Sequence, residues 1–403
     1  MLGKKKCKTS EDKIMTTHHY AQQLRKWIAS TPDKTLLAIT HDRKCCDAMG
    51  AVMGFAYYAK QFGKDVTCIF ARPHSQPMSE RLYAEVIAPN GIMVLGEELE
   101  EKGELEKIIA QSTTLFALDT SSMQNSTYLP TILGKKQLKL YCIDHHEAGF
   151  EDIAKYPGSD IIRVEEAQSA SCLITNLLRA NNALPNDQET LIALYMGMYQ
   201  DTIMIPPAHY SSLTTDAFAM VEARLLQESR QYITNLKSTP YPAQWQQYAK
   251  DALFYPTKND SIVVGLGIID NPGVVAYVAD KLLAHGISTT IVMGLAEERV
   301  GTKVYRDLVA SGRSNDSFAS QLPTLFGTVF YIESNGRIIS KGGGKITGTL
   351  ASCAANIPLN PNIDVKQQWL TEVNKRKQEL LDCNIPNECM TFYNGKDNGK
   401  TTI

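Results

Sequence analysis

Short apolar runs alternate with longer segments of helical spacing along the first half of the chain. The apolar runs predict buried strands over Thr35–Thr40, Val66–Ala71, Gly91–Leu95, Thr114–Leu118, Leu138–Ile143 and Asp160–Val164. The helical spacing predicts helices over Thr16–Ser30, Ala48–Phe62, Ser169–Ala180 and Gln188–Tyr199. Alternation of this kind indicates an α/β fold, with a mostly parallel sheet covered by helices on both faces.

The pattern changes after Ser212, where a long helical stretch is expected to reach Leu236. Prolines and polar residues then cluster at Thr239–Pro242, which indicates a connection between domains. A second α/β unit follows, with strands expected over Ile262–Leu266, Thr289–Met293 and Val300–Arg313 and a helix over Val274–Ala284. Asn335–Gly336 between apolar runs predicts a hairpin, and Asp364–Leu381 predicts a last helix.

A chain of 403 residues is too long for one ordinary core, so we expect more than one domain. The patterns divide it into an N-terminal tail and helix (1–33), a first α/β domain (34–212), a helical linker (213–258), a second, smaller α/β domain (259–357), and a C-terminal helix and tail (358–403).

Composition and charge indicate the cellular compartment of the protein and exclude some classes of partner. No apolar stretch approaches the roughly 18 residues of a membrane span, and the first residues lack the apolar core of a secretory signal. Several of the nine cysteines lie inside apolar runs, which is typical of reduced thiols in the cytoplasm. A formal net charge of −2 argues against a long duplex nucleic acid as a partner, and the oligomeric state is left open.

Imidazole and carboxylate side chains follow several of the predicted strands and one helix. These candidates are His41, Cys45 and Asp47 after the first strand, Asp119 after the fourth, Asp144, His145 and His146 after the fifth, and Asp201 after the helix Gln188–Tyr199. Each alone is most often a turn or cap residue. Together they lie where parallel sheets gather ligands, and they suffice for two divalent ions with one bridging carboxylate.

The set resembles the DHH phosphoesterase superfamily, which is named for the motif Asp144–His145–His146. The resemblance spans Lys34 to Ser212 and includes His41 with Asp47, Asp119, and Asp201–Thr202. It resumes at Ser311–Ser314 and at Gly342, Gly343 and Gly344, which look like signatures of the DHH-associated C-terminal domain. The relatives implied are nano-oligoribonucleases and bis-phosphorylated nucleotide phosphatases, in which the second domain faces the first across a cleft.

The resemblance implies a role for each candidate residue. His41, Cys45 and Asp119 would hold one ion, and Asp47, Asp119, His145 and Asp201 the other, with Mn²⁺ favoured and Mg²⁺, Co²⁺ or Zn²⁺ as alternatives. Asp144 would orient a neighbouring imidazole, and His146 would face the phosphate while a metal-bridging hydroxide attacks phosphorus. In the second domain, Arg313 would clamp a phosphate beside Ser311, Gly342, Gly343, Gly344 and Lys345.

Two positions depart from the family pattern. Cys45 stands where the family usually has aspartate, so either its thiol ligates and shifts the preference towards Zn²⁺ or Fe²⁺, or it is a buried thiol beneath the loop. Lys345 stands where the family usually has histidine, and it is either a phosphate-binding cation or a solvated lysine at a strand end.

The predicted function is that of a metal-dependent phosphodiesterase acting on short nucleotide substrates, such as di- or oligonucleotides or linear or cyclic dinucleotides. Pyrophosphate, polyphosphate and bis-phosphorylated nucleotides are alternative substrates. A degenerate protein that binds a nucleotide without turnover is the alternative from another class. The retained carboxylates and imidazoles favour an enzyme, since they are costly to cluster without a metal.

Overall fold

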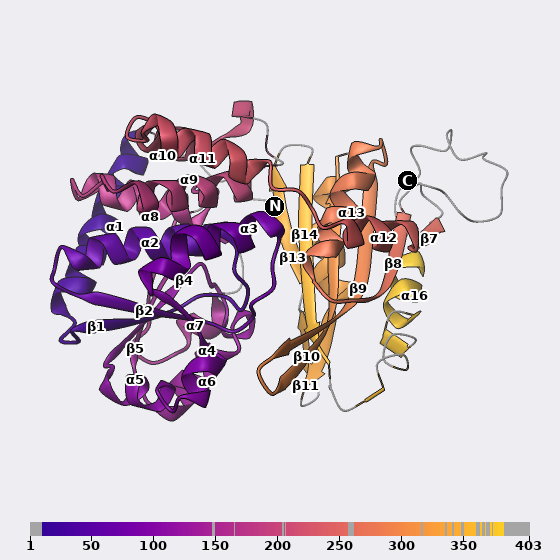
Figure 1. The fold of residues 1–403 in the computed structure, drawn as a ribbon, viewed down its shortest axis with the longest axis horizontal. Coiled ribbons are helices and arrows are strands. Elements are labelled where there is room, and N and C mark those ends of the chain that lie inside the picture. Colours follow the sequence, from indigo (N-terminus) through magenta and orange to yellow (C-terminus); the bar gives the residue numbers. More distant parts are fainter. Residues whose placement is uncertain are drawn as a thin grey trace, which may run out of the picture. The chain divides into compact units, whose positions relative to one another are not determined.

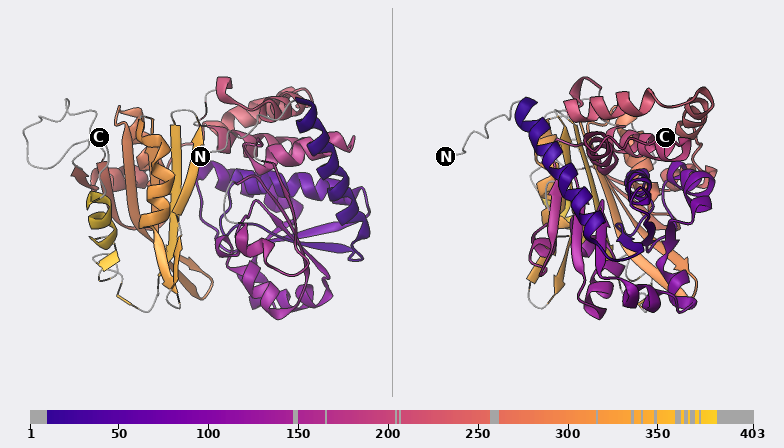
Figure 2. Two further views of the ribbon diagram at one scale, coloured as in Figure 1. Left: turned by 180° about the vertical axis from the view of Figure 1, so that it is seen from behind. Right: turned by 90° about the vertical axis from the view of Figure 1, so that its left-hand side faces the viewer.

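The computed structural model describes residues 10–382, except 147–149, 165, 204, 206, 257–261, 316, 335–336, 341, 348–349, 360–362, 365–366, 368–370 and 373. The chain forms two compact units, shown in Figures 1 and 2. The first contains residues 1–73 and 77–239, and the second contains residues 74–76 and 240–403. The finer five-part division expected from the sequence stays a prediction.

The first unit is built on a six-stranded sheet in the order β3-β2-β1-β4-β5-β6. Every pairing in it is parallel, as the sequence pattern predicts. The strands are β1 (Thr35–Ile39), β2 (Asp65–Phe70), β3 (Met93–Leu95), β4 (Thr114–Leu118), β5 (Lys139–Asp144) and β6 (Asp160–Arg163).

Helices cover both faces of this sheet, which confirms the expected layers (Figure 1). On one side lie α1 (Ser10–Ser30), α2 (Cys46–Lys60), α3 (Pro77–Leu82), α8 (Ala170–Ala180), α9 (Gln188–Thr202), α10 (Ser212–Glu222) and α11 (Gln227–Lys237). On the other lie α4 (Gly96–Glu101), α5 (Leu105–Gln111), α6 (Tyr128–Lys135) and α7 (Glu151–Ala154).

Alternating side chains of each strand pack into two separate hydrophobic cores, one on each face of the sheet. In β1, Leu36 and Ala38 pack with the helices around α2, whereas Leu37 and Ile39 pack with the helices around α6. This follows from the strand period of two, which sends successive side chains to opposite faces. Both faces are apolar because both are covered, so the strand reads as a continuous apolar run.

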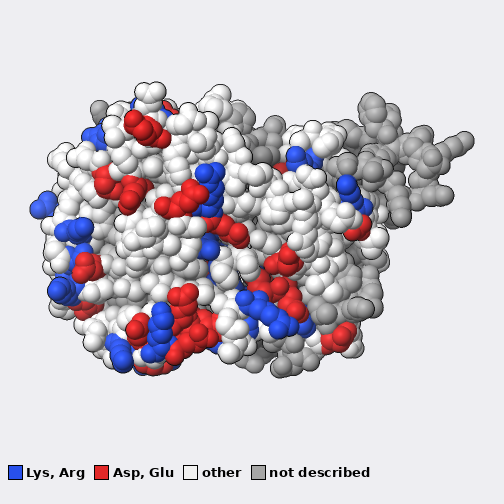
Figure 3. Space-filling view, in the orientation of Figure 1, with Lys and Arg blue, Asp and Glu red and all other residues white. Residues whose placement is uncertain are grey.

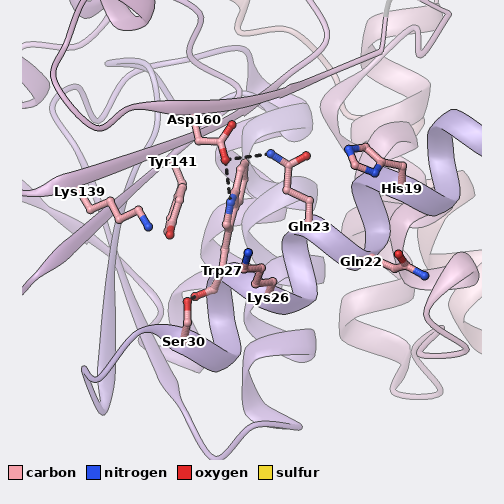
Figure 4. A pocket seen from close by; sticks show the side chains of 9 residues that line it. All are labelled: His19, Gln22, Gln23, Lys26, Trp27, Ser30, Lys139, Tyr141 and Asp160. Atoms are coloured by element: carbon pink, nitrogen blue, oxygen red, sulfur yellow. Dashed lines mark hydrogen bonds between the residues drawn. The ribbon is translucent and has the colours of Figure 1, made fainter.

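Helix α1 is fastened to the sheet through one aromatic stack and one carboxylate (Figure 4). The rings of Trp27 and Tyr141 are stacked with centroids 4.2 Å apart, and Asp160 accepts hydrogen bonds from Trp27 Nε1 at 3.1 Å and Gln23 Nε2 at 2.9 Å. A shallow pocket of about 400 Å³ lies along this seam. Since the seam is formed by side chains already bonded to one another, we interpret it as packing.

The second unit contains a mixed six-stranded sheet in the order β13-β14-β10-β9-β8-β7. Its strands are β7 (Leu253–Pro256), β8 (Ile262–Ile269), β9 (Thr289–Val300), β10 (Lys303–Ser314), β13 (Gly342–Thr347) and β14 (Leu350–Pro358). Only β8 and β9 pair in parallel among its described pairings. Helices α12 (Ala243–Lys250) and α13 (Gly273–Ala284) cover one face, and α14 (Leu322–Val329) and α16 (Asn374–Asp382) pack on the other.

The predicted hairpin is confirmed by the pairing of β11 (Tyr331–Ser334) with β12 (Arg337–Ser340). The two strands run antiparallel with Ser334 opposite Arg337. That register leaves two residues for the connection, as the Asn-Gly signal predicts.

Two helix predictions for the last part of the first unit are wrong in their extent. The expected stretch Ser212–Leu236 is two helices, α10 and α11. At the break between them, Gln188 of α9 accepts a hydrogen bond from Leu226 N at 2.9 Å and donates one to Arg224 O at 3.2 Å. Helix α9 continues to Thr202, so Asp201 lies on its last turn and does not follow it.

Among the described residues, no helix combines the length and the apolar character of a membrane span. On the face shown in Figure 3, basic and acidic side chains are interspersed, in keeping with the formal net charge of −2.

Candidate metal centre

The candidate residues gather where the strand order of the first sheet reverses. Strands β1 and β4 are neighbours, although β2 and β3 lie on the far side of β1. Ligands of open α/β sheets bind beyond the carboxyl ends of the strands at such a point. His41 follows β1, Asp119 follows β4 directly, and Asp144 ends β5, so adjacent strands bring their polar residues together.

Asp119 has an unusual backbone at the centre of this group. Its φ is +53°, and its N–H donates to Ile143 O at 3.0 Å, which fixes the turn out of β4. Its side chain is 3% exposed, and Oδ1 accepts no hydrogen bond from the described residues. An aspartate with a left-handed backbone and a buried oxygen that accepts no hydrogen bond from the described residues is a strained residue of the kind found at functional sites.

The first donor group consists of His41, Cys45 and Asp119. His41 Nε2 lies 3.0 Å from Cys45 Sγ and 3.6 Å from Asp119 Oδ2, and Cys45 Sγ lies 3.5 Å from Asp119 Oδ2. Burial lowers the pKa of His41, but the hydrogen bond and negative charge of Asp119 outweigh burial and leave that pKa raised. Burial raises the pKa of Asp119, but the His41 contact and the nearby imidazoles leave it lowered.

Cys45 also begins helix α2. It is the N-cap residue, and its Sγ accepts a hydrogen bond from Ala48 N at 3.1 Å. Burial and the neighbouring carboxylates of Asp119, Asp47 and Asp201 raise the pKa of this thiol well above its ordinary value. The structure therefore brings the thiol into the donor group, whereas the adjacent Cys46 Sγ lies 3.4 Å from Ser79 Oγ.

The second donor group is centred on His145, which is 4% exposed. Its Nε2 lies 3.4 Å from Asp201 Oδ2, 3.6 Å from Asp47 Oδ2 and 3.7 Å from Asp119 Oδ1. One ring nitrogen thus faces three carboxylates from three separate segments of the chain. Asp119 contacts both imidazoles, His41 and His145, as a bridging ligand would require.

Asp47 is held in place by the start of helix α8. Its Oδ2 accepts from Ala170 N and its Oδ1 from Ser171 N, both at 2.7 Å. Ser171 Oγ donates in turn to the backbone oxygen of Asp47 at 2.9 Å. Because a helix N-terminus carries unpaired N–H groups and a partial positive charge, it stabilises this fully buried carboxylate.

Two glycines make room for this contact. A Cβ at Gly50 of α2 would lie 2.4 Å from Ser171 Oγ, and a Cβ at Gly197 of α9 would lie 2.1 Å from it. Helices α2, α8 and α9 therefore meet closely around Ser171. Since α2 carries Asp47 and α9 carries Asp201, this packing sets the spacing of two candidate ligands.

Asp144 organises the two imidazoles that follow it. Its Oδ1 accepts from the backbone N–H groups of His145 at 2.6 Å and His146 at 3.0 Å, and it lies 2.7 Å from His146 Nδ1. Asp144 is fully buried, whereas the His146 side chain is 41% exposed. His146 thus turns an exposed ring edge outwards from a fixed position.

The donor chemistry fits divalent metal ions. Four carboxylates, three imidazoles and one thiol approach one another, and buried Asp119 Oδ1 and Asp144 Oδ2 accept no hydrogen bond from the described residues. Such a cluster of buried anionic groups is unfavourable unless cations compensate it. All eight residues predicted from the sequence for this centre are thus found together, while their roles as ligands stay predictions.

The candidates of the second unit lie on neighbouring strands. Gly312 of β10 and Gly344 of β13 both pair with Cys353 of β14, and Arg313 and Lys345 both pair with Ser352. Gly342 and Gly343 belong to the same strand β13, and the Lys345 side chain lies outside the described residues. A Cβ at Gly312 would lie 2.4 Å from the Phe326 ring, so this glycine lets α14 approach the sheet.

Arg313 is more enclosed than the prediction of a phosphate clamp suggests. It is 8% exposed, its Nε donates to Asp280 Oδ1 at 2.6 Å, and its Nη1 donates to Ser311 Oγ at 2.9 Å. The structure thus joins Arg313 and Ser311, and it adds Asp280 of α13 as an ionic partner. The phosphate-binding role of the pair stays a prediction.

Sequence reasoning missed the residues that hold the ligands. The amides of Ala170 and Ser171 carry no side-chain signal, and Gln200 Oε1 accepts from Cys46 N beside the candidate centre. A Ser–x–Ser start of α8, with Ser169 as its N-cap, was the one available hint of an anion-binding helix end.

Fold and site together are those of an α/β phosphoesterase with a buried candidate metal centre. Residues 35–198 match the family model described as the DHH family, N-terminal domain, and this part of the chain belongs to that family. The first unit of the chain thus contains a DHH-family N-terminal domain, the domain of a phosphoesterase family, and a second unit follows it. No curated protein matches the chain in sequence.

Three solved structures are similar to the chain at low sequence identity, and the first of them shares its fold. An exopolyphosphatase-related protein from Bacteroides fragilis is 16% identical with a TM-score of 0.61, covering 90% of this chain and 95% of its own. RecJ from Thermus thermophilus, solved with Mn²⁺, is 12% identical with a TM-score of 0.45, covering 92% of this chain and 55% of its own. A putative family II inorganic pyrophosphatase from Methanococcus jannaschii is 11% identical with a TM-score of 0.36, covering 85% and 99%.

Proposed function

We propose that the protein is a metal-dependent phosphodiesterase that hydrolyses short nucleotide substrates, such as di- or oligonucleotides or linear or cyclic dinucleotides. The observation that carries the proposal is the convergence of Asp47, Asp119 and Asp201 on His145 Nε2 at a sheet switch point. A buried group of this kind fits a centre for two divalent ions, with Mn²⁺ as the favoured ion where carboxylate and imidazole ligands predominate.

In this proposal, one ion is held by His41, Cys45 and Asp119, and the other by Asp47, Asp119, His145 and Asp201. Divalent ions, when bound, lower the pKa of coordinated water and polarise phosphoryl oxygens. The protein contributes ligands from regular elements, since Asp119 directly follows β4, the start of α8 holds Asp47, and Asp201 lies on the last turn of α9.

His146 is proposed to contact the scissile phosphate. Its exposed ring is held by Asp144 at 2.7 Å, so the imidazole is oriented before substrate arrives. A carboxylate beside Nδ1 favours a hydrogen on that nitrogen, so Nε2 can donate to an anionic phosphoryl oxygen only when the ring carries both hydrogens. The proposed contact with the phosphate therefore uses the doubly protonated ring.

The substrate class is proposed to be short. A formal net charge of −2 supports a small anionic substrate over a long duplex, since duplex binding needs many basic contacts. Arg313 with Ser311, the glycines of β13 and Lys345 are the proposed phosphate contacts of the second unit. A cytoplasmic location is proposed as well, supported by the free thiols of the described cysteines Cys45, Cys46, Cys68, Cys142, Cys172 and Cys353.

The test is hydrolysis of a substrate panel by protein first stripped of metal and then loaded with Mn²⁺, Mg²⁺, Co²⁺ or Zn²⁺. The panel contains 5′-labelled dinucleotides, cyclic dinucleotides, bis-phosphorylated adenosine, pyrophosphate and polyphosphate. Mononucleotide release from dinucleotides is expected. Preferential cleavage of polyphosphate would replace the nucleotide substrate, and nucleotide binding without turnover under any ion would identify a degenerate binding protein.

A further inference from the structure

We propose that the two halves of the metal centre prefer different classes of ion. The half formed by His41, Cys45 and Asp119 takes a thiophilic ion of the Zn²⁺ or Fe²⁺ class. The half formed by Asp47, His145 and Asp201 takes an oxygen-preferring ion of the Mn²⁺ or Mg²⁺ class. The inference rests on the proposed function in one respect, since it requires that the centre binds divalent ions.

The geometry of the first half suits a thiolate site. The three atoms Nε2 of His41, Sγ of Cys45 and Oδ2 of Asp119 are separated by 3.0, 3.5 and 3.6 Å. Donor atoms at such separations can all lie about 2.0–2.3 Å from one ion, as Zn–N, Zn–O and Zn–S bonds require. A Cys/His/Asp set is borderline to soft in character, which favours Zn²⁺ or Fe²⁺ over Mg²⁺ and Mn²⁺.

The position of Cys45 favours the thiolate once an ion is present. Its sulfur accepts a hydrogen bond from Ala48 N at 3.1 Å at the beginning of α2, a helix of 15 residues. A helix N-terminus stabilises negative charge on a thiolate. The sulfur is therefore directed at His41 and Asp119 by the same contact that starts the helix.

The second half offers no sulfur among its described donors. Asp47 Oδ2 and Asp201 Oδ2 lie 3.6 and 3.4 Å from His145 Nε2. Two carboxylates and one imidazole form a harder set, which suits Mn²⁺ or Mg²⁺. Because Asp119 contacts both halves, the two ions would share one carboxylate while differing in their remaining donors.

Cys45→Asp and Cys45→Ser separate ligation from folding. Aspartate and serine are both favoured N-cap residues, so each preserves an acceptor for Ala48 N. Cys46→Ser is the matched control. It changes the neighbouring thiol, which is fully buried and contacts Ser79 but belongs to neither donor group.

The experiment uses the full chain, stripped of metal and then reloaded. With Co²⁺, a thiolate ligand gives a near-ultraviolet charge-transfer band, which is expected in the natural protein and in Cys46→Ser and is expected to be absent in both Cys45 variants. With Zn²⁺ limited to one equivalent per chain and Mn²⁺ in large excess, elemental analysis should find both metals in the natural protein. Cys45→Asp should lower the preference for Zn²⁺ over Mn²⁺ on the order of tenfold.

The outcomes distinguish this inference from the proposed function. Binding of two ions with no thiolate band, and with the same metal ratio in the natural protein and Cys45→Asp, overturns the inference and leaves the phosphodiesterase proposal standing. Failure to bind any of the ions overturns both.

Discussion

Asp144 Oδ1 lies 2.7 Å from His146 Nδ1 and also accepts the backbone N–H groups of both histidines that follow it. One fully buried carboxylate thus fixes the backbone of the motif and the ring of its last residue. Asp144 is a positioning residue in this arrangement, because it acts on substrate only through His146.

Asp144→Asn is therefore expected to lower turnover by about 10- to 100-fold, the usual cost of removing a carboxylate behind a functional imidazole. The amide retains an acceptor for the backbone N–H groups, so the fold should persist. Steady-state kinetics with metal analysis check this, and kcat should fall while KM and metal content stay near those of the natural protein. A loss of metal content or stability equal to the loss of turnover would assign Asp144 a purely structural role.

Asp119→Ala and His146→Ala should separate metal binding from catalysis. Asp119 contacts donors of both halves of the centre, so its removal should lower the content of both ions. The His146 side chain is partly exposed, so His146→Ala should leave the metal content near that of the natural protein. Turnover should fall by about 10²-fold or more. Equal metal loss in the two variants would contradict these roles.

Gly197→Ala should destabilise the protein and weaken metal binding. A Cβ at this position would lie 2.1 Å from Ser171 Oγ and 2.9 Å from Cys46 O, so α8 or α9 must shift. Overpacking of this kind costs about 1–3 kcal/mol. Denaturant unfolding and Mn²⁺ titration measure the two effects.

Gly134→Ala is the matched control, since nothing lies within 4 Å of a Cβ built at that position of α6. It should leave metal binding unchanged and leave stability unchanged or raised by up to about 1 kcal/mol, because alanine favours helix. Equal destabilisation by the two changes would show that the Ser171 contact is not what matters.

Asp160→Ala should destabilise the protein without affecting the metal centre. The change removes the acceptor for Trp27 Nε1, and losing the partner of a part-buried donor costs about 1–3 kcal/mol. Thermal unfolding and metal content check this prediction. A fall in metal content at retained stability would indicate that α1 influences the centre through β5.

Removal of divalent ions should lower the midpoint of thermal unfolding. The centre buries several carboxylates that a cation would compensate. A ligand at 100 times its Kd adds about 2.7 kcal/mol of stability. Calorimetry after chelation and after readdition of Mn²⁺ measures the effect. An unfolding midpoint that is the same with and without Mn²⁺ would argue against binding.

The residues of the candidate metal centre could be predicted from the sequence because apolar runs mark where the strands of this fold end. Leu115–Leu118 is an unbroken apolar run, and Asp119 directly after it must lie at the edge that ligands use. The helix ends were harder. The helix with Cys45 as N-cap was expected to start at Ala48, because a cysteine is not a usual N-cap signal.

Contacts between distant segments were beyond the reach of sequence patterns. The break before Leu226 depends on the Gln188 side chain, and the fixation of Asp47 depends on two backbone amides of α8. Neither contact changes the periodic pattern of apolar and polar residues from which helices and strands are predicted. Likewise, Asp280 is an unremarkable helix residue until the fold brings it to Arg313.

The positive φ of Asp119 restricts which residues can ever occupy that position. Aspartate, asparagine and glycine tolerate such a backbone best, whereas other side chains meet the following carbonyl oxygen at a cost of roughly 1–2 kcal/mol. Only one of the three tolerated residues carries a charge. Exchange of this ligand for glutamate during evolution would thus be opposed by the main chain itself, even where the ion accepts either carboxylate.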